Sequence, residues 1–145
     1  MGADFVSILP SSDAHVSYSH EYDIKVRLLG LIDNNLAQTW EAISYTSNFK
    51  IEEANNKIDF VIDSLEKMLK DAGADESEKT QILRGVYYFV DHSDCDGTFD
   101  TYECKYISIA LKALNAHEEG EDGAIENLIK VFDDAFNGEG EVLIC

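Results

Sequence analysis

Four carboxylates surround one glycine in residues 92–103, which read His-Ser-Asp-Cys-Asp-Gly-Thr-Phe-Asp-Thr-Tyr-Glu. Carboxylate and carbonyl oxygens are the ligands that calcium prefers, and the ion takes about six to eight of them from a flexible segment of backbone. The packing of apolar side chains does not explain this concentration of acids. The segment therefore predicts a loop that binds a divalent cation, with calcium as the first choice and magnesium as the alternative.

Counting residues around Gly97 gives the spacing of a helix-loop-helix calcium site. If Gly97 is the sixth residue of a twelve-residue loop, oxygen-bearing side chains fall at the third, fifth, seventh, ninth and twelfth positions. A glycine at the sixth position permits the positive φ angle with which the backbone turns around the ion. The predicted ligands, in that order, are Asp94, Asp96, Thr98, Asp100 and Glu103.

The first position of this loop departs from the pattern, because His92 stands where an aspartate is expected. Imidazole is a poor ligand for calcium. Three explanations stay open: a weak site, a site completed by Asp91, or a loop that no longer binds metal. A further alternative needs no metal, because Asp100 as the N-cap and Glu103 at the third helical position would form a capping box. That alternative does not explain the two earlier aspartates.

The chain is strongly acidic, with 29 acidic and 11 basic side chains and a formal net charge of −18. Such a chain is not expected to bind nucleic acid or an anionic membrane directly. It carries no recognisable signal peptide or membrane anchor, and its three cysteines are expected to be free thiols. These features predict a cytoplasmic protein.

Hydrophobic periodicity predicts the fold class as all-α, a compact helical bundle built from helix-loop-helix units. Residues 1–22 show no sustained period and are expected to be a flexible N-terminal arm. Residues 23–145 are expected to be a single helical domain. Its helix-loop-helix units would lie at about 24–72 and 77–116, with a truncated third unit at 124–145.

The apolar pattern also predicts several helix boundaries. Residues 23–45 form either one long helix or two helices that break near Asn34 and Asn35. The next helix is expected to end near Gly73, which suits a left-handed C-terminal cap, and the helix after it to open at Ser77. No segment alternates clearly enough to predict a strand.

An internal echo supports a repeated plan. Residues 132–142 line up with residues 89–99 at an offset of 43, matching a phenylalanine, an aspartate, an acid before a glycine and an apolar residue two positions later. Ala135 and Asn137 occupy two ligand positions of the second copy, so that copy is a weaker candidate for metal binding. The alternative is a frayed helix end with a glycine-rich tail.

The residues from Asp96 to Glu103, followed by Ile107, Ala110 and Leu114, resemble the acidic helix-turn-helix signature of the tellurite-resistance TerB-like family. The resemblance covers about residues 77–116 and implies a compact all-helical bundle. The same loop also resembles an EF-hand. An EF-hand would place an aspartate at His92 and its paired loops closer together, so the TerB-like resemblance ranks slightly first.

Either resemblance implies a divalent-cation role for four residues, Asp94, Asp96, Asp100 and Glu103. The EF-hand resemblance adds the expectation of a calcium sensor or light-chain-like subunit that opens a groove for a partner helix. The TerB-like resemblance adds tellurite resistance as the associated process.

The expected function is that of a non-enzymatic protein that binds a divalent cation and works through a protein partner. The chain lacks a nucleophile elbow, a phosphate-binding loop and a zinc-protease helix motif. The alternative is an acidic inhibitor, of the immunity-protein or nucleic-acid-mimic type, that blocks a basic partner surface without a specific metal. A cation site needs acids that converge on one turn, whereas a mimic needs acids spread along one face.

Aromatic side chains cluster in the sequence on both sides of the loop. They form either a patch that faces a partner or half-buried core rings with hydrated hydroxyls. The residues concerned are Tyr87, Tyr88, Phe89, Tyr102 and Tyr106.

Overall fold

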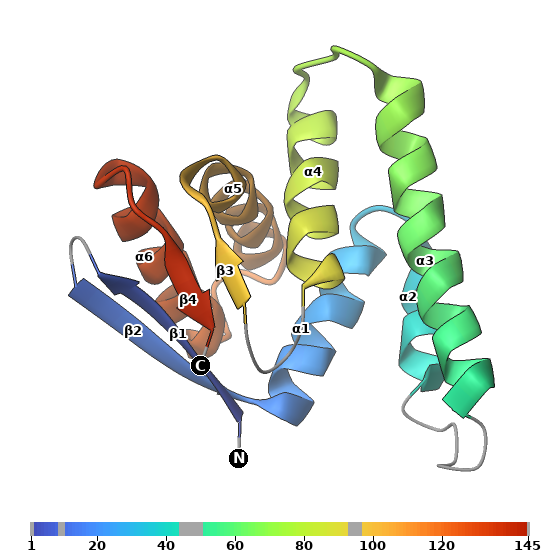
Figure 1. Cartoon of the computed structure of the whole chain (residues 1–145), viewed down its shortest axis with the longest axis horizontal. Helices are drawn as coiled ribbons and strands as arrows, with labels where there is room; N and C mark the ends of the chain where they lie inside the picture. Colours follow the sequence, from blue (N-terminus) through green and yellow to red (C-terminus); the bar gives the residue numbers. More distant parts are fainter. Residues whose placement is uncertain (1, 9–10, 44–50, 93–96, 145) are drawn as a thin grey trace.

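The computed structural model describes residues 2–8, 11–43, 51–92 and 97–144, and these residues form six helices and a four-stranded antiparallel sheet (Figure 1). The helices are α1 (Tyr18–Gly30), α2 (Asn34–Ile43), α3 (Ile51–Ala72), α4 (Glu78–Asp91), α5 (Thr101–His117) and α6 (Gly123–Asn137). The strands are β1 (Gly2–Ile8), β2 (Ser11–Ser17), β3 (Gly97–Phe99) and β4 (Val142–Ile144).

Several predicted helix boundaries are confirmed. The described part of the predicted stretch, residues 23–43, falls into two helices, and Asp33 caps the second by accepting a hydrogen bond from the Asn35 amide at 2.7 Å. Gly73 has a φ of +61°, as a left-handed cap requires. The Ser77 hydroxyl accepts from the Thr80 amide and caps α4.

The all-α prediction is wrong, because the strands form a sheet in the order β2-β1-β4-β3. Residues 1–22, expected to be a flexible arm, contain the hairpin of β1 and β2 and the first residues of α1. Ala3 and Phe5 alternate inward on β1, but the next inward residue is Ser7, which breaks the apolar pattern. The strands β3 and β4 have three residues each, too few to show any period.

A cluster of four phenylalanine rings joins the sheet to the helices. Each ring comes from a different element, each side chain is almost completely buried, and neighbouring ring centroids lie 5.3–6.4 Å apart. Stacked, tilted and edge-to-face contacts all occur in this cluster, and they add to the free energy gained by burying the rings. The cluster consists of Phe5 of β1, Phe89 of α4, Phe99 of β3 and Phe132 of α6.

The pairing of β3 with β4 follows the internal echo of the sequence. Phe99 lies opposite Val142, and this is the pair of equivalent residues at the offset of 43. Two equivalent residues face each other in an antiparallel ladder when a local two-fold axis passes between them. Phe89 and Phe132, also equivalent, make an edge-to-face contact beneath the ladder. The segments α4-β3 and α6-β4 are therefore related units that pair through their strands.

The helices α3 and α2 form the side of the molecule away from the sheet (Figure 1). Of the 22 residues in α3, only Val61 and Leu65 are buried, so most of this helix faces solvent. The buried face of α3 is therefore narrow, and it packs against α2 and α4.

We predict that Gly85→Ala destabilises the fold, because α4 and α5 approach most closely at this glycine. A Cβ atom there would lie 2.0 Å from the Tyr106 carbonyl oxygen and 2.7 Å from the Ala110 Cβ. Overpacking of this kind costs about 1–3 kcal/mol. Urea unfolding measures the loss.

Gly30→Ala is the matched control, since a Cβ atom there meets nothing within 4 Å. It should leave the free energy of unfolding unchanged or raise it by up to about 1 kcal/mol. Equal stability of the two variants would contradict the close approach of the two helices.

Candidate functional site

The candidate cation loop connects α4 to α5 through the short strand β3. The helix α4 ends at Asp91, and His92 takes the extended C-cap conformation. Gly97 has a φ of +131°, so the sixth position of the loop has the backbone conformation that the sequence predicts for it. The strand β3 then holds Gly97–Phe99 in the sheet, and Asp100 begins the exit helix.

The two ends of the loop, His92 and Glu103, lie close together. One carboxylate oxygen of Glu103 accepts from the Asp100 amide at 3.1 Å, and the other lies 3.5 Å from Nε2 of His92. The His92 ring also rests on Phe99, with centroids 3.9 Å apart. The first and twelfth positions of the loop are therefore in direct contact with each other.

Asp100 and Glu103 form a capping box at the start of α5. The Asp100 carboxylate accepts from the Glu103 amide at 2.8 Å, and Glu103 returns the contact to the Asp100 amide. This arrangement satisfies free amides at the helix N-terminus without any metal. The capping box that the sequence offers as an alternative to metal binding is therefore present.

The remaining predicted ligands are not gathered by the described structure. Asp94 and Asp96 lie outside the described residues. Thr98 and Asp91 are exposed. Among the residues that the structure describes, no group of three or more histidine, cysteine, aspartate or glutamate side chains is placed to hold a metal.

A buried lysine of α1 contacts the loop from the other side. Lys25 is 3% exposed, and its ammonium group donates to the His92 carbonyl at 3.4 Å. It lies 3.8 Å from the carboxylate of Glu21, which is equally buried, and 5.9 Å from the centroid of the Trp40 ring. A buried charge needs such partners. The sequence did not predict this contact. The available signal was the position of Lys25 among the buried residues of α1.

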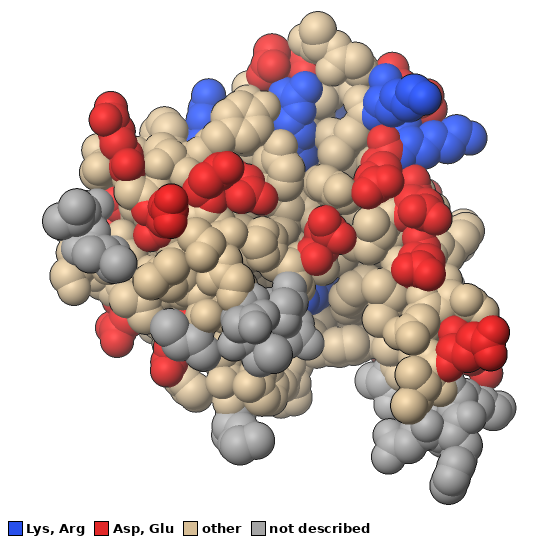
Figure 2. All heavy atoms as spheres, in the orientation of Figure 1, with Lys and Arg blue, Asp and Glu red and all other residues tan. Residues whose placement is uncertain are grey.

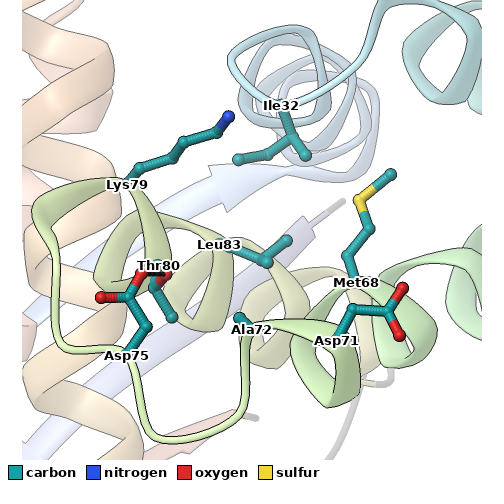
Figure 3. Close-up of a pocket in the computed structure, with 8 residues that line it drawn as sticks. All are labelled: Ile32, Met68, Asp71, Ala72, Asp75, Lys79, Thr80 and Leu83. Atoms are coloured by element: carbon teal, nitrogen blue, oxygen red, sulfur yellow. Dashed lines mark hydrogen bonds between the residues drawn. The ribbon is translucent and has the colours of Figure 1, made fainter.

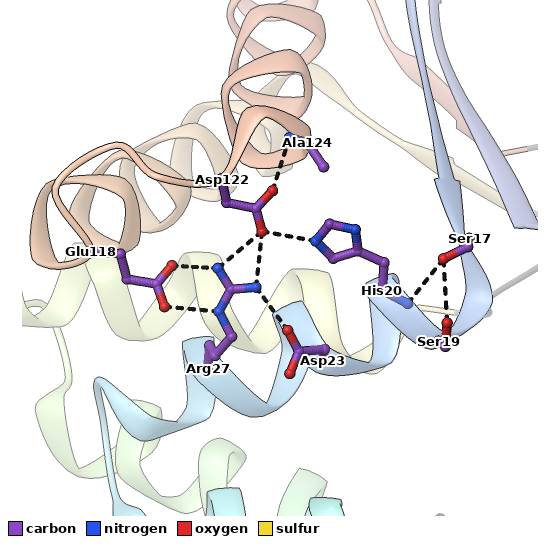
Figure 4. Close-up of polar contacts among 8 residues, drawn as sticks. All are labelled: Ser17, Ser19, His20, Asp23, Arg27, Glu118, Asp122 and Ala124. Atoms are coloured by element: carbon purple, nitrogen blue, oxygen red, sulfur yellow. Dashed lines mark hydrogen bonds and ion pairs between the residues drawn. The ribbon is translucent and has the colours of Figure 1, made fainter.

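An ionic cluster ties α1 to the connection between α5 and α6 (Figure 4). The Arg27 guanidinium makes two hydrogen bonds to Glu118, one of them from Nε at 2.8 Å. It also reaches Asp23 at 2.9 Å and Asp122 at 3.0 Å. His20 lies 2.8 Å from the same oxygen of Asp122. Planar, bidentate pairs of this type are strong and directional. The cluster therefore fixes α1 against the connection between α5 and α6.

The electrostatics of the cluster favour its charged state. Hydrogen bonds to Glu118 raise the pKa of Arg27 against the opposing effect of burial. Burial alone would raise the pKa of Asp122, but hydrogen bonds from His20, Arg27 and the Ala124 amide outweigh it and hold that pKa below its usual value. The cluster is therefore a structural link whose charges satisfy one another.

A cavity of about 470 Å³ lies between the end of α3 and the start of α4 (Figure 3). Its apolar wall consists of Ile32, Met68 and Leu83. The Asp75 carboxylate beside it accepts from the hydroxyls of Ser77 and Thr80, both at 2.7 Å. The cavity lies at the opposite end of α4 from the candidate loop, about 20 Å away along the helix. The cavity therefore lies apart from the predicted cation loop.

Cys104 is a free thiol in the core next to the loop. Burial raises its pKa to about 12, and the nearby Asp100 and Glu103 carboxylates act in the same direction. Because the thiolate is the reactive form, this cysteine is poorly suited to nucleophilic chemistry at neutral pH.

Comparison of the chain with protein-family models, with curated proteins and with solved structures finds no match. Among the described helices, none has the length and apolar character needed to cross a membrane.

We predict that Arg27→Met lowers the free energy of unfolding by about 1–3 kcal/mol, because it leaves Glu118 and Asp122 without their cation. The matched control is Lys130→Met, which removes an exposed pair with Asp134 within one helix and should cost no more than about 0.5 kcal/mol. Urea unfolding at neutral pH measures both.

The Arg27 effect should also depend on pH. A carboxylate whose folded pKa is depressed stabilises the fold above its unfolded pKa and loses that contribution as pH falls through the folded pKa. The difference between Arg27→Met and the wild type should therefore begin to shrink below about pH 4, where Asp122 of the unfolded chain starts to bind a proton, and shrink further as pH falls through the lower pKa of folded Asp122. A difference that is constant from pH 7 to strongly acidic conditions would contradict the ionic link.

Proposed function

We propose that this chain is a non-enzymatic protein that binds a divalent cation, calcium in the first place, in the loop of residues 91–103 and acts through a protein partner. The observation that supports it most is the pairing of β3 with β4 at the equivalent residues Phe99 and Val142. Such pairing fixes Gly97–Phe99, in the second half of the loop, in a sheet directly before the capped start of α5.

The ion would be held by the carboxylates of Asp94, Asp96 and Glu103, together with the main-chain carbonyl of Thr98. Asp100 would act through water while it caps α5, as the ninth position of such loops often does. Asp91 is the alternative ligand for the first position. The contact between the first and twelfth positions supports this assignment, because both ends of the loop already converge near Glu103.

Binding would have a cost that lowers the affinity. Glu103 contacts the Asp100 amide and the His92 ring, and at least one of these contacts must be given up before both of its oxygens reach an ion. Lys25 adds a further positive charge at the His92 carbonyl. A positive side chain close to a cation site disfavours the ion. We therefore expect a weaker calcium site than one with an aspartate at its first position.

Both family resemblances remain part of the proposal. The EF-hand-like reading accounts for two related units that pair through short strands. The TerB-like reading depends on the same acidic turn and the helix that follows it. Neither reading predicts the strands β1 and β2, which extend the sheet beyond the pair.

A second candidate function is an acidic inhibitor that occupies a basic surface, and the exposed face of α3 favours it. Glu52, Asp59, Asp63 and Glu66 are all exposed, and their spacing places them on one stripe of the helix about 21 Å long. In Figure 2 acidic side chains follow α3 from its middle to its N-terminal end. Such a row would attract a basic cleft, with an affinity that falls as salt is added.

We predict that calcium raises the thermal stability of the chelator-stripped protein more than magnesium or sodium chloride does at matched ionic strength. A ligand at about 100 times its dissociation constant adds about 2.7 kcal/mol to the free energy of unfolding. The double variant Asp96→Ala/Glu103→Gln should lose this response and keep most of its helical content, because its changes lie at the loop and the first turn of α5.

The matched control is Asp59→Ala/Glu66→Gln, which removes two carboxylate charges from α3 instead of two from the loop. It should respond to calcium like the wild type. If the loop variant keeps the wild-type response, the assigned ligands are wrong. Equal stabilisation of the wild type by all three salts would indicate charge screening alone and would favour the inhibitor function.

A further inference from the structure

A cluster of four tyrosines lies where α4 meets α5, directly beside the candidate loop. Neighbouring ring centroids lie 4.9–6.4 Å apart, in tilted and edge-to-face arrangements. The members are Tyr87 and Tyr88 of α4 and Tyr102 and Tyr106 of α5. Tyr106 is buried at 4% exposure, Tyr87 and Tyr88 are half-buried, and Tyr102 is 53% exposed. The cluster thus has a packed base and an open aromatic surface.

The base of the cluster already binds cations of the chain itself. The Arg84 guanidinium lies 5.6 Å from the Tyr106 ring centroid, and the Lys105 ammonium lies 5.3 Å from it. Both distances fall within the range of favourable cation–π contacts. The half-buried ring of Tyr88 and the exposed ring of Tyr102 belong to the same cluster and offer the same kind of aromatic surface.

Two carboxylates, those of Glu66 and Glu103, lie beside the tyrosine cluster. The Tyr87 hydroxyl donates to the Glu66 carboxylate of α3 at 2.9 Å. Burial raises the pKa of Tyr88 to about 12, and the neighbouring Tyr102 and the Glu103 carboxylate act in the same direction, against the opposing charge of Arg84. Negative charge beside exposed aromatic rings attracts a positive group and disfavours phosphate.

We propose that the tyrosine cluster is a docking surface for an arginine-bearing segment of a protein partner. An arginine of the partner would lie on the open faces of Tyr88 and Tyr102 while its guanidinium meets the carboxylates around them. Arginine fits better than lysine, because its planar group stacks on aromatic rings and pairs with carboxylates at the same time. Tyrosine and arginine are also the residue types that carry binding energy at many protein interfaces.

The inference rests on the proposed function only in that both involve a protein partner, and its test is independent of calcium. The probe is an acetylated and amidated Gly-Arg-Gly-Arg-Gly peptide, and the lysine peptide of the same length and charge is its comparison. Both are titrated into the full chain in chelator at matched ionic strength, and the tyrosine ring signals are followed by NMR.

We expect the ring signals of Tyr88 and Tyr102 to move with the arginine peptide, and its dissociation constant to be about threefold or more below that of the lysine peptide. Tyr102→Leu should abolish this difference, whereas Tyr102→Phe should keep it, because phenylalanine retains the aromatic face. Tyr18→Leu, which changes a tyrosine of 39% exposure on α1, should bind both peptides as the wild type does.

Equal affinities for the two peptides without movement of the ring signals would mean diffuse attraction to the negative charge of the chain, and would overturn the inference. Wild-type discrimination in Tyr102→Leu, with its helical content unchanged, would also overturn it. Neither result bears on whether calcium stabilises the protein, so failure here is distinct from failure of the cation site.

Discussion

The contact between two related helix-strand units, through Phe99 and Val142 and the phenylalanine rings beneath them, is the constraint on which the rest of the structure depends. The ladder is only three residues long, and a pair of such short strands is not stable alone in water. Burial of the rings of Phe89 and Phe132 against Phe99 supplies the free energy that the short ladder lacks. The hairpin of β1 and β2 then extends the sheet, and Phe5 joins the same cluster.

This constraint also determines what the candidate loop can do. Because Gly97 begins β3 and Asp100 caps α5, the second half of the loop is held in place before any ion arrives. The first half begins at His92, whose carbonyl accepts from the buried Lys25 and whose ring contacts Glu103. Lys25 and the His92 ring therefore lie near the positions that an ion would occupy. Cation binding at this loop is a competition between an external ion and these internal partners.

Local sequence signals predicted the parts of the fold that depend on neighbouring residues. Gly73, Ser77 and the capping box of α5 follow from side chains that bond to amides or turns within a few residues. The sheet was missed because the inward pattern of β1 contains Ser7 and because β3 and β4 have only three residues each. The contacts of Lys25 and Arg27 join residues 67 and 91 positions apart, and no local pattern encodes such partners. The offset of 43 was the one long-range signal in the sequence, and one pair of the β3–β4 ladder, Phe99 and Val142, joins residues at that offset.

The most direct test of the central claim is a calcium titration of the wild-type protein followed by backbone amide NMR. The account predicts saturable shifts at Gly97 and Glu103, smaller shifts at Val142 across the ladder, and little change in α3. Magnesium at the same ionic strength should give weaker or different shifts, since it demands a smaller and more regular coordination shell. The claim would be contradicted by shifts that are spread over all acidic surfaces and never saturate, or by equal shifts with sodium chloride.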